Sequence, residues 1–173
     1  FVTNFLTGNH IVYANTLYSA LYGFHIEIPD EWSKMKPNYP WTLFNYAKLG
    51  SGENMNINIK SAQGISSIKQ FPLEQAFNPY YEDVKFIEKN YEIVSGIDVF
   101  KCIYKWKDSF YKKVERKYRL QYFGAQWIKD DKLFTVIITD LEEKFSKNTK
   151  TYRKIVDSIK FTLADADRIS KEN

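Results

Sequence analysis

The stretch DVFKCIYKWKDSFYKKVERKYRLQYFGAQWIKDDKLFTVIITD, residues 98–140, decides the fold expected for this chain. In Val99–Lys107 the even positions are apolar, and the odd positions are mostly lysines. A similar alternation recurs in Lys113–Phe123, where Val114, Tyr118 and other apolar residues alternate with charged ones. A period of two residues is typical of a strand with one face in a core and the other in water. Both segments are therefore predicted to be strands of one sheet.

Leu133–Thr139 (LFTVIIT) is apolar at both parities, which predicts the most deeply buried strand. The links at Asp108–Ser109 and Asp130–Asp131 are short and polar, as tight turns require. The stretch therefore predicts three consecutive antiparallel strands. Residues on the inward parity are expected to share one buried core: Tyr104, Trp106, Tyr118 and Ile138.

Composition indicates one folded domain with an aromatic core. The chain has 173 residues, 44% of them hydrophobic, with 13 Tyr and 13 Phe, which excludes a disordered chain. At this length a domain buries roughly 70% of its unfolded surface. The net charge of +4 permits an acidic partner without requiring one. The single cysteine, Cys102, forbids an internal disulfide and is expected to be buried.

Other patterns add strands and helices on either side of the central stretch. Strands are predicted at Tyr22–Ile28, Trp41–Lys48 and Asn54–Lys60, because each alternates apolar and polar residues. Asn78–Pro79 followed by apolar residues at helical spacing predicts a helix ending near Asn90, and a second helix is predicted over about Asn148–Ser158. Residues 17–163 then form a single α+β domain, an antiparallel sheet with helices packed on it. Residues 1–16 are expected to be an N-terminal arm or remnant, and 164–173 a polar tail.

Two segments resemble a known fold family. Tyr22–Trp32 (YGFHIEIPDEW) is similar to the first strand of Mog/PsbP-like proteins, and Tyr152–Phe161 (YRKIVDSIKF) is similar to their closing helix and strand. The order of strands and helix between them also fits, so that the resemblance covers roughly Tyr18–Phe161. The resemblance implies an α/β/α sandwich in a non-enzymatic protein. Members of the family include extrinsic subunits of photosystem II, a nuclear Ran-binding protein and bacterial lipoproteins or exported proteins.

The sequence offers no catalytic residue, metal site or cofactor motif. The two histidines, His10 and His25, belong to no cluster with ligand spacing. There is no G-x-S-x-G nucleophile motif and no G-x-G-x-x-G phosphate loop. The acidic pairs Asp130–Asp131 and Glu142–Glu143 fit a turn and a helix start. We therefore expect a domain that is not an enzyme and has no cofactor.

Basic residues project from the outward parity of the predicted central strands. Because neighbouring strands lie about 4.8 Å apart, these charges would form one patch. The candidate binding residues are Lys101, Lys105, Lys107, Lys117 and Arg119. As a binding site the patch would dock an acidic protein or an anionic membrane surface, whereas otherwise it is a solvated face that deters edge pairing. Nucleic acid is disfavoured, since the aromatic rings of these strands are expected to point the other way.

Three classes of function remain open from the sequence. The first is a non-catalytic binding or accessory domain of an exported, envelope-associated protein, which places the chain outside the cytoplasm, in the periplasm or at the surface. The second is an intracellular protein-binding adaptor of the Ran-binding kind, which would be cytoplasmic. The third is a small-ligand binder or enzyme that uses a cleft between sheet and helix.

Overall fold

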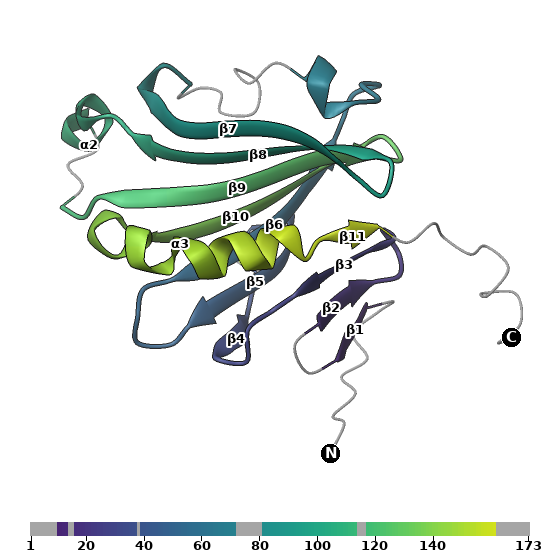
Figure 1. Cartoon of the computed structure of the whole chain (residues 1–173), viewed down its shortest axis with the longest axis horizontal. Coiled ribbons are helices and arrows are strands. Elements are labelled where there is room, and N and C mark those ends of the chain that lie inside the picture. The colour runs from purple at the N-terminus through teal and green to yellow at the C-terminus, as the bar shows by residue number, and fades with distance from the viewer. Residues whose placement is uncertain (1–9, 14–15, 38, 72–80, 114–116, 162–173) are drawn as a thin grey trace, which may run out of the picture.

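The fold consists of two antiparallel sheets and a long helix that packs against the larger sheet (Figure 1). The computed structural model describes residues 10–13, 16–37, 39–71, 81–113 and 117–161. The seven-stranded sheet has the order β4-β5-β6-β10-β9-β8-β7, and the four-stranded sheet has the order β1-β2-β3-β11. The chain is thus an α+β sandwich built on antiparallel strands, as the sequence predicts.

The elements have the following bounds. The large sheet contains β4 (Trp32–Met35), β5 (Thr42–Lys48), β6 (Asn54–Ser61), β7 (Val84–Val94), β8 (Ile97–Trp106), β9 (Leu120–Lys129) and β10 (Lys132–Leu141). The small sheet contains β1 (His10–Tyr13), β2 (Thr16–Ser19), β3 (Phe24–Glu27) and β11 (Lys160–Phe161). Among the described residues, the helices are α2 (Asp108–Lys113) and α3 (Glu142–Asp157), and the 3₁₀ turns are η1 (Ile68–Gln70) and η2 (Tyr81–Asp83).

Two tight turns fix the register of the central strands. Asp130 and Asp131 join β9 to β10 with φ angles of 51° and 56°. Ser95 and Gly96 join β7 to β8 with φ angles of 49° and 80°. Two consecutive residues with positive φ are the signature of a type I′ hairpin turn, in which Asp and Gly are favoured residues. The predicted turn at Asp130–Asp131 is confirmed, whereas the predicted turn at Asp108–Ser109 is the start of helix α2.

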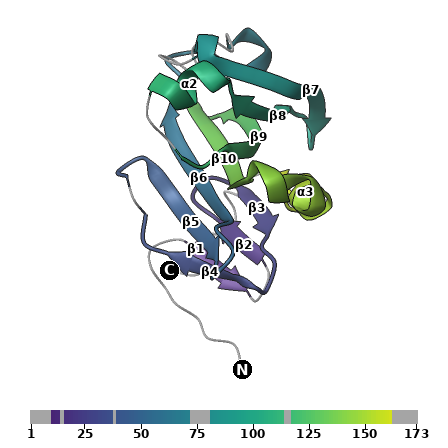
Figure 2. The same ribbon diagram turned by 90° about the vertical axis from the view of Figure 1, so that its left-hand side faces the viewer.

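The main core lies on the face of the large sheet that meets α3 and the small sheet, which we call the first face (Figure 2). Trp127 on β9 is at its centre and is fully buried. The Trp127 ring stacks on Phe134 of β10, with centroids 5.3 Å apart, and meets Phe24 of β3 edge-on at 5.5 Å. Phe161 of β11 lies 5.3 Å from the same ring. These aromatic contacts join the two sheets.

The opposite face, the second face, carries a core of its own. Phe100, Cys102 and Tyr104 of β8 pack there with Ala62 and with Ile68 of η1. The prediction that the even-numbered side chains of β8 are buried is therefore confirmed for these three residues. The predicted burial of Cys102 is confirmed as part of this. However, Val99 and Ile103 are buried on the first face, so that neither face of β8 is simply in water.

The predicted common core of Tyr104, Trp106, Tyr118 and Ile138 is wrong. Tyr104 and Trp106 belong to the cluster on the second face, and Ile138 belongs to the core on the first. Tyr118 is 63% exposed. The expectation failed for Tyr104, Trp106 and Ile138 because it assumed a sheet with one buried face, whereas this sheet is covered on both. It failed for Tyr118 because this residue precedes β9 and is not part of the sheet.

The predicted strand Lys113–Phe123 is also wrong for its described residues before Leu120. Residues 108–113 form α2, with Asp108 in its first turn, and β9 begins only at Leu120. The strand instead continues through Gly124 to Lys129. A side chain at Gly124 would place Cβ 3.2 Å from the Cys102 Sγ, so that glycine leaves room for the buried thiol. Residues 114–116 lie outside the described part of the chain.

The predicted helix that ends near Asn90 is replaced by strand β7. Residues 84–94 pair with β8 along their whole length, with a bulge between Phe86 and Glu88. The segment VKFIEKNYEIV is rich in β-branched and aromatic residues, which favour a strand. Pairing with β8 across the Ser95–Gly96 turn thus outweighs the helical spacing of the apolar residues in this segment. The predicted start of the helix, at Asn78–Pro79, lies outside the described residues.

The remaining predicted elements are confirmed with shifted ends. β3, β5 and β6 correspond to the three strands predicted before residue 61, and α3 begins six residues earlier than Asn148. Of the predicted arm, residues 10–13 form β1 and Thr16 begins β2, and the next residue, Leu17, is fully buried. Residues 1–9 and the predicted tail 164–173 lie outside the described residues.

Replacing Trp127 by alanine is expected to lower the free energy of unfolding by about 3–5 kcal/mol, because it leaves a large cavity where the sheets meet. Denaturant unfolding measures this. The matched control is Trp41→Ala, which removes a side chain that is 46% exposed and should cost less than about 1 kcal/mol. Similar losses in both variants would contradict the assigned core.

Alkaline pH is expected to destabilise the fold through Cys102. Burial raises the pKa of its thiol to about 12, whereas an unfolded cysteine ionises near pH ~8.5. The contribution of this thiol to stability is therefore complete below about pH 8.5 and is lost as pH rises toward 12, because only the unfolded state releases its proton. The urea midpoint should fall above pH ~8.5.

The Cys102→Ala variant isolates this effect. Its unfolding free energy should fall less steeply with pH than that of the wild type, by at most about 1.4 kcal/mol per pH unit, the value for one proton. Equal slopes for the two proteins between about pH 9 and 11 would show that the thiol does not carry the effect.

Candidate functional site

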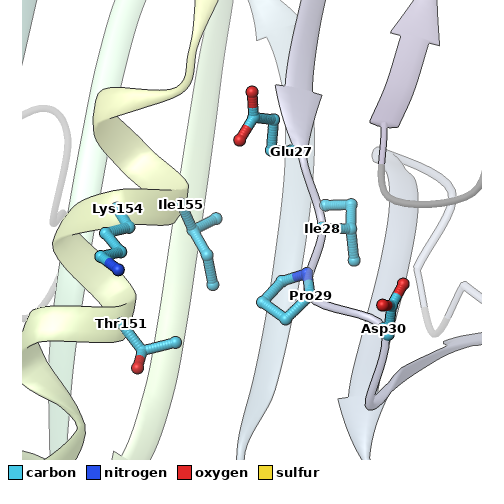
Figure 3. A pocket seen from close by; sticks show the side chains of 7 residues that line it. All are labelled: Glu27, Ile28, Pro29, Asp30, Thr151, Lys154 and Ile155. Atoms are coloured by element: carbon cyan, nitrogen blue, oxygen red, sulfur yellow. The ribbon is translucent and has the colours of Figure 1, made fainter.

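A pocket of about 330 Å³ lies between α3 and the chain that leaves β3 (Figure 3). Residues 27–30 form one wall, and Thr151, Lys154 and Ile155 of α3 form the other. The first wall turns because Pro29 cannot extend the strand ladder, and the Trp32 N–H donates to the Pro29 carbonyl oxygen at 2.9 Å. The second wall is held in place by the Ser158 hydroxyl, which accepts a hydrogen bond of 2.8 Å from the Glu27 N–H.

Charged side chains surround this pocket. Glu27 and Asp30 bring carboxylates from one wall, and Lys154 brings an amine from the other. All three are exposed, and no ion pair within the described part of the chain involves them. Such charges suit a partner with complementary groups better than a buried reaction centre. The sequence predicted the end of the strand at Pro29 and the helix, but no local sequence pattern predicts that these two elements lie side by side.

The candidate binding residues on β8 do not form the predicted basic patch. Lys101 and Lys105 lie on the first face, at the two ends of α3. Lys101 binds Glu92 and also Asp157 near the end of the helix, at 2.7 Å. Lys105 binds Glu142 in the first turn of the helix. Both amines are thus paired with carboxylates because the helix covers the face that was expected to be in water.

The other three candidates lie near α2, at the end of β8 that carries Lys105 and away from Lys101. The Lys107 amine donates to the Glu82 carbonyl oxygen, and Arg119 pairs with Asp108 at 2.9 Å. Lys117 is exposed and sits over the ring of Tyr118. The five residues therefore do not form the one continuous patch that was predicted. Their role in binding stays a prediction.

A buried pair of carboxylates fastens α3 to the large sheet. Glu53 lies just before β6 and Asp140 lies near the end of β10, and both are at most 4% exposed. The Tyr152 hydroxyl of α3 lies 2.8 Å from Glu53 Oε1 and 2.8 Å from Asp140 Oδ2. The Asn148 amide donates to the same two oxygens, at 2.7 and 3.1 Å. We call these four residues the acidic cluster.

Two close carboxylates can form an acid–base pair, so the accessibility of this cluster decides its role. The Asp140 side chain is fully buried, and its second oxygen accepts a hydrogen bond from the Leu141 N–H at 2.7 Å. Burial, and then the hydrogen bonds to both carboxylates, raises the pKa of Tyr152 far above its ordinary value. A substrate cannot reach these oxygens, and the hydroxyl stays protonated. The acidic cluster is therefore structural, and sequence spacing gave no sign of it, since its members come from three separate elements.

The described residues include no group of three or more His, Cys, Asp or Glu that could hold a metal ion. His25 is partly exposed on β3, opposite Lys160. The acidic pairs Asp130–Asp131 and Glu142–Glu143 occupy the predicted turn and helix start. In the part of the chain that is described, no helix is both long enough and apolar enough to span a membrane.

Replacing Tyr152 by phenylalanine is expected to lower the free energy of unfolding by about 2 kcal/mol, since the buried carboxylates lose a hydroxyl that contacts both. Thermal and denaturant unfolding near neutral pH measure the loss. Tyr118→Phe is the matched control, because that ring is 63% exposed and its hydroxyl has solvent available. A Tyr152→Phe variant as stable as the control would show that the cluster does not hold α3 in place.

Comparison with known proteins shows a shared fold at low identity. No family model matches the sequence, and no curated protein matches it. The cyanobacterial PsbP protein (CyanoP) of Synechocystis sp. PCC 6803 is similar in structure, with a TM-score of 0.62 and 13% identity over 86% of this chain and 93% of that one. The Ran-binding protein Mog1p of Saccharomyces cerevisiae is similar with a TM-score of 0.55 and 10% identity over 85% and 94% of the two chains. A point mutant of the protein Mog1 gives a TM-score of 0.57 at 10% identity, over 84% and 93%. This chain therefore has the Mog/PsbP-like fold.

Proposed function

We propose that this chain is a non-catalytic, protein-binding domain of an exported, envelope-associated protein, and that its partner docks over the pocket beside α3. The observation that carries the proposal is the set of exposed charges around that pocket, Glu27, Asp30 and Lys154. Ion pairs at the rim of an interface accelerate association and select the partner. The buried acidic cluster offers no competing reaction centre, because substrates cannot reach it.

The placement outside the cytoplasm rests on the resemblance to bacterial exported proteins. The gene sequence upstream of the Phe1 codon tests this placement. A signal peptide or a lipidation motif encoded there supports export, and a start methionine without either of them opposes it. Fractionation of the source cells provides the second measurement, with the chain expected in the envelope fraction.

Charge reversal at the pocket tests the docking proposal. Lys154→Glu and Asp30→Lys should each weaken capture of the native partner about tenfold, which corresponds to about 1.4 kcal/mol of binding free energy. Capture is quantified by mass spectrometry on partners that the wild-type domain retains from envelope extracts. Unfolding midpoints should hardly change, because exposed charges contribute little to stability.

Lys112→Glu is the control for these variants. Lys112 is an exposed lysine on α2, an element that Figure 2 shows at the far end of the molecule from β1–β3. The Lys112→Glu variant should capture the partner as the wild type does. If both pocket variants retain full capture, the partner does not dock there; if Lys112→Glu loses capture instead, the site lies near α2.

A second candidate is an intracellular adaptor of the Ran-binding kind. It is favoured by the extent of the similarity to Mog1p, whose chain is covered over 94% of its length. Purified Ran tests it directly by calorimetry. A complex with Ran, together with recovery of the chain from cytosol, would replace the exported function by this one.

A third candidate is a small-ligand binder or an enzyme. The pocket between α3 and β3 is at the small end of the range of ligand-binding cavities, which is about 300–1,000 Å³. Thermal-shift screening with small polar metabolites tests this candidate. A ligand whose stabilising effect disappears in Lys154→Glu would favour it over protein docking.

A further inference from the structure

Strand β7 forms a long open edge of the large sheet (Figure 1). It is last in the strand order, and no strand of the described residues pairs with its outer side. It spans Val84–Val94, whereas β4 at the opposite edge spans only Trp32–Met35. An edge strand presents unpaired N–H and C=O groups to which another strand can hydrogen-bond. The short β4 limits such pairing, whereas the length of β7 permits it.

The middle of β7 projects into solvent on both faces of the sheet. Every side chain of residues 87–91 is exposed, although successive residues of a strand point to opposite faces. The large apolar side chains of Ile87, Tyr91 and Ile93 are 52%, 41% and 69% exposed. Exposed apolar side chains on an open edge are typical of a place where a further strand adds to the sheet.

A bulge and a turn bound the part of β7 that can accept a strand. The register with β8 shifts between Phe86 and Glu88, and a bulge interrupts regular pairing. The other limit is the turn at Ser95–Gly96. Residues 88–94 are therefore the regular segment, with Tyr91 at its centre. A second copy of this segment, antiparallel about a two-fold axis at Tyr91, would pair with it from end to end.

The charges of the segment select the same register. Directly opposite residues of antiparallel strands lie about 4.5–5.5 Å apart and on one face, so that like charges there repel. An axis at Lys89 would bring two lysines together, and an axis at Glu92 would bring two glutamates together. An axis at Asn90 would place Glu88 opposite Glu92. Of the axes that keep most of the segment paired, only the one at Tyr91 leaves no like charges directly opposite.

We propose that β7 pairs with β7 of a second copy, antiparallel about Tyr91, and so forms a two-fold dimer with one continuous sheet. Lys89 then lies opposite Ile93 of the other copy, and the aliphatic stem of the lysine covers this exposed side chain. Asn90 lies opposite Glu92, whose carboxylate accepts from the amide. The two Tyr91 rings meet at the axis. The dimer uses a different element from the pocket, so neither proposal depends on the other.

Ion pairs within each copy offset the repulsion that this register leaves. The Glu88 and Glu92 carboxylates of the two copies become diagonal neighbours on the first face, at roughly 7–8 Å. Each is already paired within its own chain, Glu92 with Lys101 and Glu88 with Arg153 of α3. The acidic side chains near the axis are therefore matched by basic ones. Because a two-fold contact uses the same surface of both copies, the assembly closes at two chains.

Charge substitutions at Ile93 test the register in the whole chain. Ile93→Lys places a lysine opposite Lys89 twice in the dimer and should weaken dimerisation about tenfold or more. Adding Lys89→Glu to this variant should restore the affinity, because opposite charges then face each other. Sedimentation equilibrium measures the dissociation constant of the dimer. Ile93 is 69% exposed, so the fold should survive, and unfolding midpoints verify this.

Leu49→Lys is the matched control. Leu49 is 71% exposed and lies between β5 and β6, on the other side of the sheet order from β7. A lysine there should leave the dissociation constant unchanged.

Cysteine cross-linking gives a second measurement of the register. Only a residue at the axis faces its own equivalent, at a Cα separation that a disulfide can span. Mild oxidation should therefore link two copies of Tyr91→Cys and should not link copies of Ile93→Cys. The native Cys102 is buried and does not compete.

The proposal is overturned if the wild-type chain stays monomeric up to about 1 mM, or if Ile93→Lys dimerises as tightly as the wild type. A double variant that stays dissociated, or cross-linking through Ile93→Cys alone, would overturn the register. If the chain is monomeric and its β7 amides become protected from hydrogen exchange only in envelope extract, the edge binds a strand of another protein and the second copy is wrong.

Discussion

The short contacts of the Tyr152 hydroxyl with Glu53 and Asp140 are the interaction on which the arrangement of this domain depends. They connect the middle of α3 to the start of β6 and the end of β10. Two buried carboxylates repel each other and are costly to bury, so they persist only where donors surround them. Tyr152 and Asn148 provide those donors from one helix face. The helix is therefore fixed in position, and the wall of the pocket that Thr151 and Lys154 form is fixed with it.

Placing α3 on the first face also determines what the lysines of β8 do. Lys101 and Lys105 flank Ile103 on that face, where the helix covers the isoleucine and its carboxylates pair with the amines. Partly buried ion pairs of this kind orient the helix rather than attract a distant partner. Basic residues that a strand pattern assigns to a docking patch thus become contacts within the fold. Charges suited to an outside partner are instead those at the pocket rim, which no described residue pairs.

Local patterns predicted those parts of the fold that local physics determines. The turn at Asp130–Asp131, the alternating strand Asn54–Lys60 and the helix around Tyr152 follow from turn chemistry and periodicity. The sequence could not show that β7 pairs with β8 instead of forming a helix, because pairing depends on residues that lie apart in the chain. It also could not show that both faces of the sheet are covered, which determines the contacts of Lys101 and Lys105. The pocket and the acidic cluster were missed for the same reason, since each joins separate elements.

The two faces of the large sheet give the domain two surfaces of different chemistry. On the first face, the helix and the small sheet exclude water from the aromatic core around Trp127, and Lys154 lies exposed at the margin of that face. On the second face the strands β5, β6 and β10 present amides and hydroxyls, because β6 alternates asparagine with buried Met55 and Ile57. Asparagine is a poor strand former, so local stability does not explain its repetition there.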